Sequence, residues 1–333
     1  MTNKDTTPKD QQNGDDAIFT SLRAQEWDEF FGQEQLKTSL QISIQAAKER
    51  KEQLDHVLLY GPPGLGKTTL AHLIAKELGV NLKITSGTAL TKAGDLAAIL
   101  TNLQPGDCLF IDEIHRLPKG VEETLYPAME DFALDIVVGK GPSARTIRLD
   151  VPKFTLIGAT TRFGLLAGPF RDRFGIIHRL KLYTPKVLSR IIYAASDKLH
   201  CSITDEAALE IAARSRGTPR IALKLTKRAR DFVQVQGRKE VARDDVIAAL
   251  KMYAVDSLGL HETERTFLLE IIHKHNGGPV GLSTITALLN EDAVTVEEVL
   301  EPYLLQSGLI KRTPKGRVIT QLGYAHVGVQ YTE

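Results

Sequence analysis

Cysteine, long apolar runs and an excess of charge are all scarce in this sequence, and each shortage excludes a class of protein. The 333 residues include two cysteines, Cys108 and Cys201, without a Cys-x-x-Cys pair, so neither a disulfide framework nor a zinc site is expected. This usage fits a reducing, cytoplasmic environment. No apolar run approaches the roughly 18 residues of a membrane-spanning helix, and residues 1–17 lack the apolar core of a signal peptide, so we expect a flexible tail there.

The charge is almost balanced. Lys and Arg number 42 and Asp and Glu 41, which gives a net charge of +1, so only the local distribution of charge can indicate nucleic-acid binding. A hydrophobic content of 42% and a charged content of 25% are typical of globular proteins and exclude disordered, collagen-like and coiled-coil classes. At roughly 100–200 residues per domain, the length favours two or three domains.

The first half of the chain alternates short apolar runs with helical patterns, which predicts an α/β domain over 18–183. Runs of this kind, bounded by Gly, Pro or polar residues, are typical of parallel strands covered on both faces. We expect strands at His56–Tyr60, Leu82–Thr85, Cys108–Ile111 and Phe154–Gly158, with a helical stretch at Gln33–Gln53 before them. Residues 132–151 predict a hairpin inserted into this domain, which could be a docking surface for a partner, a lid or a structural addition.

The second half predicts two smaller domains. Residues 184–254 carry three helical segments and no strand, which indicates a small helical domain. Residues 257–333 show three helices followed by a hairpin, the pattern of a winged helix.

A phosphate-binding loop is the most specific motif in the chain. Gly61–Thr68 reads GPPGLGKT, which matches G-x-x-x-x-G-K-[ST] between a predicted strand and a predicted helix. Glycines such as Gly64 and Gly66 let backbone N–H groups face phosphate oxygens, Lys67 reaches the terminal phosphates, and the Thr68 hydroxyl coordinates Mg²⁺. Thr69, the next residue of the helix, is also expected to contact the nucleotide. The motif therefore predicts ATP and Mg²⁺ as cofactors.

Two adjacent carboxylates, Asp112 and Glu113, end the strand that begins at Cys108. Side chains alternate along a strand, so the two acids must have different roles. We expect Asp112 to hold the metal and Glu113 to polarise the attacking water as general base.

Four motifs in this order resemble those of AAA+ ATPases. They are Gly61–Thr68, Asp112–Leu117, Gly158–Arg162 and Gly217–Arg220, which look like Walker A, Walker B, sensor 1 and sensor 2. The chain closely resembles the RuvB family, the bacterial motors of Holliday-junction branch migration, over residues 22–328. The segments that carry this resemblance are GPPGLGKTTLA, DEIHRL and GATTR, followed by the expected winged helix. The resemblance implies a P-loop AAA+ domain with a parallel sheet, a small helical lid domain and a winged-helix DNA-binding domain.

The resemblance also implies further catalytic residues. Sensor 1 ends the strand between the phosphate-loop strand and the Walker B strand, so Thr160 or Thr161 would hold the attacking water, with Thr161 preferred. Arg220 would be sensor 2, which contacts the nucleotide from the lid. Arg173 would be the arginine finger that completes a neighbouring subunit's site, although Arg171 could fill that role. A finger acting in trans implies a ring, and the family's ring is a homohexamer.

The remaining nucleotide contacts implied by the resemblance come from three parts of the chain. Leu22 and Arg23 match the family's N-terminal adenine-site segment, and Tyr183 lies at the end of the large domain. Glu130, Asp131 and Phe132 match a further nucleotide-contacting segment.

A basic cluster on the expected wing predicts binding to double-stranded DNA. Lys311, Arg312, Lys315 and Arg317 lie in an interval without any acid between Pro302 and Gln321, and such a cluster faces phosphates rather than bases. Arg312 and Arg317 match the family's DNA contacts. A second basic group near 216–230 fits a solvated helix face.

Three functions compete at this stage. The first is an ATP-driven DNA motor that moves Holliday junctions with RuvA, docked on the hairpin at 132–151, and with the resolvase RuvC. The second is a DNA-bound switch of the replication-initiator type. The third is a protein unfoldase, which we discount because residues 86–95 contain no aromatic side chain to grip a polypeptide.

Overall fold

A computed structural model describes residues 21–138 and 145–331. These residues form two compact units. The first runs as far as Lys198 and takes in Thr218–Leu223, and the second comprises Leu199–Gly217 and the chain from Lys224 onward. Within the described ranges no helix is long and apolar enough to cross a membrane.

The first unit is built on a five-stranded parallel sheet with the strand order β2-β3-β6-β1-β7. The strands are β1 (Val57–Tyr60), β2 (Leu82–Ser86), β3 (Cys108–Asp112), β6 (Thr155–Thr160) and β7 (Ile176–Arg179). The three central strands are almost entirely buried, as expected when helices cover both faces. The four strands predicted from the sequence are confirmed as β1, β2, β3 and β6. Strand β7, at the edge of the sheet, was not predicted.

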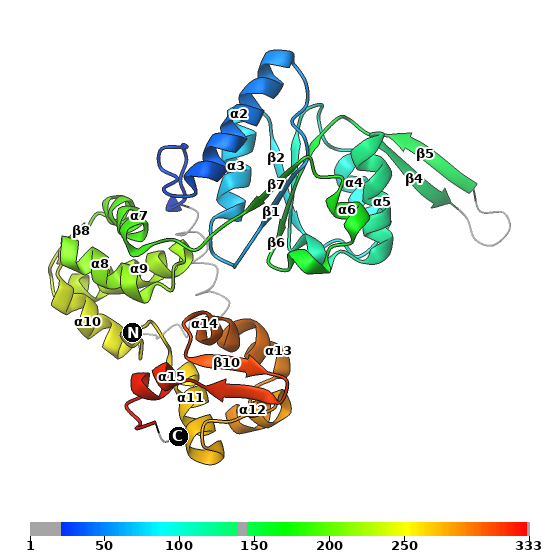
Figure 1. Cartoon of the computed structure of the whole chain (residues 1–333). Helices are drawn as coiled ribbons and strands as arrows, with labels where there is room; N and C mark the ends of the chain where they lie inside the picture. The colour runs from blue at the N-terminus through cyan, green and yellow to red at the C-terminus, as the bar shows by residue number, and fades with distance from the viewer. Residues whose placement is uncertain (1–20, 139–144, 332–333) are drawn as a thin grey trace, which may run out of the picture. The chain divides into compact units, whose positions relative to one another are not determined.

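Helices cover the sheet on both sides, with α2 and α3 on one and α4 and α5 on the other (Figure 1). The helices of this unit are α2 (Glu34–Arg50), α3 (Lys67–Leu78), α4 (Ala93–Leu100), α5 (Lys119–Glu130), α6 (Gly168–Arg171) and α7 (Pro185–Lys198), with short 3₁₀ turns η1 (Ile114–Arg116) and η3 (Phe163–Leu165). Helix α3 ends where Gly79 adopts a left-handed conformation and its N–H bonds back to the last turn, a common way to end a helix.

The predicted hairpin is present and is inserted between α5 and β6. Strand β4 (Ala133–Val138) pairs antiparallel with β5 (Arg145–Asp150), and the two project away from the sheet (Figure 1). The Val151 N–H donates to the Phe132 carbonyl at 2.8 Å, which closes the base of the insertion. Residues 139–144 between the strands lie outside the described part of the chain.

The segment 185–254, which the structure describes throughout, contains four helices rather than the three predicted. Helix α7 is followed by α8 (Asp205–Arg214), α9 (Pro219–Val235) and α10 (Arg243–Met252). The expectation that no strand occurs here is wrong, because β8 (Ser202–Ile203) pairs in parallel with β9 (Glu240–Val241). Two residues are too few for an alternating pattern to reveal a strand.

The C-terminal part of the second unit is a winged helix. Its elements are α11 (Glu262–His275), α12 (Leu282–Leu289), the continuous segment α13 (Ala293–Thr295), η4 (Val296–Leu300) and α14 (Glu301–Gln306), then β10 (Ile310–Thr313), β11 (Gly316–Ile319) and α15 (Gln321–His326). Phe267, Leu268 and Leu304 are fully buried in its own core. The predicted fold class is confirmed, and α15 adds a helix that was not predicted.

Candidate nucleotide site and wing

The carboxyl ends of parallel strands meet at one edge of a sheet, and this edge collects the predicted motifs. The loop after β1 carries Gly61–Thr68, β3 ends at Asp112 and β6 ends at Thr160. Strand β6 lies between β1 and β3, as expected for the sensor 1 strand. Ligands of open α/β sheets bind in this position.

A cavity of about 550 Å³ opens at this edge. It brings together most of the nucleotide-site residues predicted from the sequence, and its lining consists of Arg23, Pro63, Gly64, Gly66, Lys67, Thr68, Thr69, Asp112, Glu113, Pro219, Arg220 and Leu223. The cavity therefore combines a loop of backbone donors, three basic side chains and two carboxylates.

The phosphate loop needs glycine for both conformation and space. Gly64 and Gly66 have φ of 76° and 100°, in the left-handed region that favours glycine. A Cβ on Gly64 would lie 2.9 Å from Cβ of Arg220, and the Arg220 N–H donates to the Gly64 carbonyl at 3.3 Å. The start of α9 is thus packed directly on the loop.

Lys67 is buried at the floor of the cavity. Its Nζ donates to the carbonyls of Gly61 and Pro62, both at 2.9 Å. Burial lowers the pKa of Lys67, while the neighbouring carboxylates of Asp112 and Glu113 act in the opposite direction. A phosphate group would offer this buried ammonium a charged acceptor.

Asp112 is the last residue of β3 and Glu113 lies just beyond the strand, and both line the cavity. Glu113 has a left-handed backbone with φ 47°, and its N–H donates to Asp112 Oδ1 at 2.9 Å. Its own Oε2 accepts from Thr161 Oγ1 at 3.1 Å. Thr160 is fully buried and bonds instead with His115 and with the Arg162 N–H, both at 2.9 Å. Of the two threonines, Thr161 is the one whose hydroxyl contacts Glu113.

An apolar pocket of about 100 Å³ continues from the cavity, and the residues common to both linings are Arg23, Gly66, Thr69, Pro219 and Leu223. Leu22 and Tyr183 line it, and both are buried. The Tyr183 hydroxyl donates to the Leu65 carbonyl at 3.1 Å, and burial raises the pKa of Tyr183, so the phenol stays protonated. The predicted base-binding residues therefore lie beside the phosphate loop.

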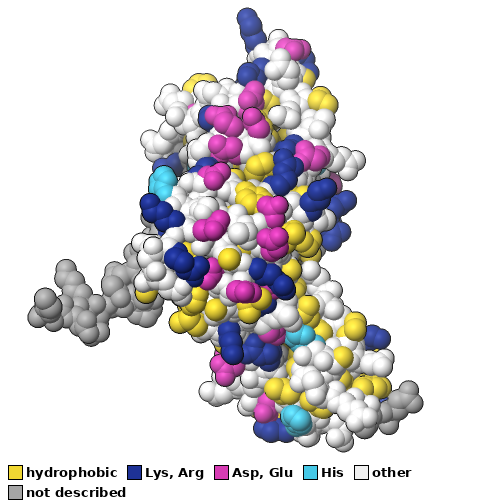
Figure 2. All heavy atoms as spheres, turned by 90° about the vertical axis from the view of Figure 1, so that its left-hand side faces the viewer, with side chains coloured by type: hydrophobic (Ala, Val, Ile, Leu, Met, Phe, Trp, Pro, Cys, Tyr) yellow, Lys and Arg dark blue, Asp and Glu magenta, His cyan; other side chains and the backbone are white. Residues whose placement is uncertain are grey.

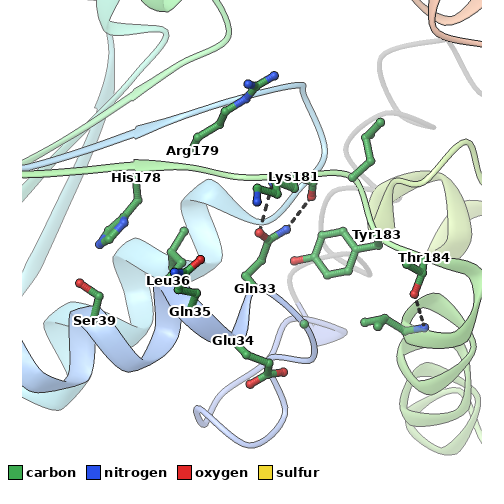
Figure 3. Close-up of a pocket in the computed structure, with 13 residues that line it drawn as sticks. Gln33, Glu34, Gln35, Leu36, Ser39, His178, Arg179, Lys181, Tyr183 and Thr184 are labelled. Carbon is green, nitrogen blue, oxygen red and sulfur yellow. Dashed lines mark hydrogen bonds between the residues drawn. The ribbon is translucent and has the colours of Figure 1, made fainter.

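A larger pocket of about 650 Å³ contains none of the predicted site residues except Tyr183. It lies between the start of α2 and the chain that joins β7 to α7 (Figure 3). The Gln33 side chain donates to the Lys181 carbonyl at 2.6 Å and accepts from the Lys181 N–H at 3.2 Å. These bonds fix the path of the chain toward Tyr183.

Glu130, Asp131, Phe132 and Arg173 do not line the nucleotide cavity. Glu130 pairs with Arg173 at 3.2 Å, and the Arg173 guanidinium lies 4.3 Å from the centre of the Tyr126 ring. Asp131 pairs with Arg148 of the hairpin at 2.8 Å. The structure therefore does not bring these four residues to the cavity of the same chain. Arg171 lies 5.1 Å from the Phe163 ring.

On the wing, the two predicted DNA contacts differ in exposure. Lys311, Arg312 and Lys315 are exposed, whereas Arg317 is buried. Arg312 and Arg317 each bond in a bidentate manner to Glu301 at 2.8–3.1 Å and also reach Glu297 at 3.1 Å.

Glu301 is the buried centre of this wing network, which consists of Glu297, Glu301, Arg312 and Arg317. Burial raises the pKa of Glu301, but the hydrogen bonds from Arg317 and Arg312 outweigh it and hold that pKa below its usual value. The hydrogen bond to Glu301 likewise raises the pKa of Arg317. Glu297 and Glu301 were not predicted as site residues, and neither was His115, which lies beside Glu113. Glu301 stands one position before the acid-free interval, and His115 stands inside the quoted DEIHRL motif.

Acidic and basic side chains are interspersed over the face of the molecule shown in Figure 2, in keeping with the balanced net charge.

The parallel sheet with a phosphate loop, an acid pair and a polar strand end at one edge, followed by helical and winged-helix parts, defines an AAA+ ATPase. Family models agree in sequence over nearly the whole chain: the Holliday junction DNA helicase RuvB P-loop domain matches residues 22–180, the RuvB AAA lid domain 183–256 and the RuvB C-terminal winged-helix domain 257–328. The chain belongs to the RuvB family.

Solved structures support the same membership. The Thermotoga maritima RuvB Holliday junction branch migration motor is 51% identical, with a TM-score of 0.84 over 94% of this chain and 100% of that chain. A point mutant of Thermotoga maritima RuvB is also 51% identical, with a TM-score of 0.85 over 93% of this chain and 99% of the other.

Proposed function

We propose that this protein is an ATP-driven motor that promotes branch migration of Holliday junctions, acting as a homohexamer with RuvA and with the resolvase RuvC. The observation that carries the proposal is the cavity that unites Lys67, Asp112, Glu113 and Arg220 in a chain that ends in a winged helix. The proposed substrate, the Holliday junction, comes from the Thermotoga relative, which is named a Holliday junction branch migration motor.

In the proposed hydrolysis step the loop of Gly64 and Gly66 holds the phosphates, and Lys67 exchanges its carbonyl acceptors for phosphate oxygens. Glu113 accepts a proton from the attacking water, and Thr161 orients that water from the end of β6. Leu22, Arg23 and Tyr183 hold the base and ribose, Thr69 contacts the nucleotide from the start of α3, and Arg220 senses the terminal phosphate.

Mg²⁺ fits the same cavity. The ion prefers oxygen ligands and keeps several waters, and the Thr68 hydroxyl and the Asp112 carboxylate both line the cavity. When bound, the ion would neutralise phosphate charge, and these two side chains would hold it.

Arg173 is proposed as the arginine finger for a neighbouring copy. Because Arg173, Glu130, Asp131 and Phe132 lie away from this chain's own cavity, a role for them at a nucleotide requires a second copy. A homohexamer supplies such a neighbour at every site.

DNA is proposed to bind at the wing through Lys311, Arg312 and Lys315, which are exposed. Arg317 would contribute by fixing the wing rather than by meeting phosphate directly, because it is buried against Glu301. Each phosphate contact that is lost should lower the salt dependence of binding by about one unit.

The hairpin is proposed as the docking site for RuvA. Ile147 and Leu149 of β5 are 46% and 38% exposed, and because they are two residues apart on a strand they share one face. Exposed apolar side chains on a projecting hairpin suit a protein partner better than a nucleotide.

The test is ATP-dependent dissociation of a synthetic four-way DNA junction by the wild type and by Lys67→Ala, each with and without RuvA. We expect RuvA-stimulated dissociation that Lys67→Ala abolishes, because the buried ammonium is lost from the phosphate loop. Binding of ATP and duplex DNA without movement of the junction would refute the motor and favour an initiator-type switch.

A further inference from the structure

His115 lies behind the proposed general base. It belongs to the 3₁₀ turn η1, directly after Glu113, and its side chain is only 4% exposed. Its Nδ1 is 3.3 Å from Glu113 Oε2 and 2.9 Å from Thr160 Oγ1. One ring nitrogen thus faces both the Walker B acid and the end of β6.

The two contacts of Nδ1 indicate where the imidazole carries its proton. An unprotonated Nδ1 would direct its lone pair at the carboxylate oxygen of Glu113, and the repulsion between the two is unfavourable in a buried position. With a proton on Nδ1, the imidazole donates to Thr160 Oγ1, because a hydroxyl oxygen can accept as well as donate, and the same N–H lies next to the carboxylate oxygen Oε2 of Glu113. We assign that tautomer on these contacts.

The same contacts connect the acid to the phosphate loop. Thr160 lies on β6, and its carbonyl accepts the N–H of Gly61 at 3.2 Å. His115 therefore links Glu113 to the strand end that supports the first residue of the loop, and it limits where the carboxylate can lie relative to bound phosphate.

We propose that His115 is a positioning residue that holds the Glu113 carboxylate, through its Nδ1–H, in the orientation needed to activate water. This inference rests on the proposed role of Glu113 as general base. His115 itself does not line the nucleotide cavity, so its loss should affect turnover rather than nucleotide binding.

The experiment compares two amide substitutions in the full-length protein. His115→Asn places an amide N–H near the position of Nδ1, whereas His115→Gln places it near that of Nε2. We expect His115→Gln to lower kcat by about tenfold or more, since a poorly placed general base loses much of its contribution of about 10²–10⁴. The KM for ATP should stay within about twofold, since the groups around the phosphates are untouched. His115→Asn should keep kcat within about threefold of the wild type.

Binding of a fluorescent ATP analogue and thermal unfolding accompany the kinetics for both variants. Equal kcat values for Asn and Gln would overturn the proposal. Loss of nucleotide binding or of folding in His115→Gln would also overturn it, by showing that the side chain is needed for structure instead. Glu113→Gln is measured in parallel: if it turns over ATP at the wild-type rate, the proposed role of Glu113 fails, independently of the result for His115.

Discussion

Replacing Arg317 by Ala should weaken the winged helix before it affects any contact with DNA. The Arg317 side chain is 9% exposed and its partner Glu301 is 1% exposed, so the substitution leaves a buried carboxylate with Arg312 alone. Breaking a buried ion pair costs about 3–5 kcal/mol. Because Arg312 still offers a bidentate partner, we expect the lower end, about 3 kcal/mol, which is roughly a 150-fold increase in local unfolding at 1.36 kcal/mol per tenfold.

Hydrogen exchange of the amides in α11 and α14 measures this change in the intact chain, because the slowest amides report the opening of the core. Arg312→Ala is the matched control: Arg312 bonds to the same Glu301 but is 54% exposed, so its loss should cost only about 1 kcal/mol. Replacing both partners, Arg317→Met with Glu301→Leu, should recover most of the stability, since no buried charge remains. Unchanged exchange in Arg317→Ala together with a lower salt dependence of DNA binding would refute this reasoning and make Arg317 a direct phosphate contact.

Three further substitutions test other parts of the structure. Gly87→Ala should allow ATP binding but abolish hydrolysis, because the added Cβ would lie 2.5 Å from the Glu113 carbonyl; equilibrium binding and ATPase rates separate the two, and normal turnover would contradict this. Glu297→Gln should tighten duplex binding up to about fivefold by removing a competitor of phosphate for Arg312, since exposed pairs contribute at most about 1 kcal/mol; titration at fixed salt measures it, and weaker binding would argue against such competition. Ile147→Ser should leave basal ATPase unchanged and remove stimulation by RuvA; full stimulation would exclude this part of the hairpin from docking.

Much of the nucleotide site could be predicted from the sequence because its signals are local. A phosphate loop requires glycines at fixed spacing beside a strand, and this pattern located Gly64, Lys67 and Thr68 without any knowledge of the fold. The buried strands β1, β3 and β6 were equally clear as short apolar runs. Edge strand β7 was missed because none of its four residues is buried and it ends in His178 and Arg179, so its pattern resembles that of a loop.

What could not be predicted depends on residues far apart in the chain. The sequence presents the wing as a basic cluster free of acids, yet Glu297 and Glu301 meet Arg317 from 20 and 16 positions away. Charge counted along a sequence does not reveal which arginine is neutralised in the fold. The choice between Thr160 and Thr161 similarly depends on which hydroxyl points to Glu113, and only the packing of β6 beside β3 determines that.

The hydrogen bond that joins Phe132 and Val151 at the base of the hairpin has a consequence for the evolution of this protein. Since the insertion leaves and re-enters the domain at almost one point, its length and surface can change without altering the register of β3 and β6. Under the proposed docking of RuvA on the hairpin, selection can therefore refine how that partner is recognised while the hydrolytic edge of the sheet stays constant. Under the same proposal, hairpins exchanged between relatives would transfer partner preference as a self-contained unit.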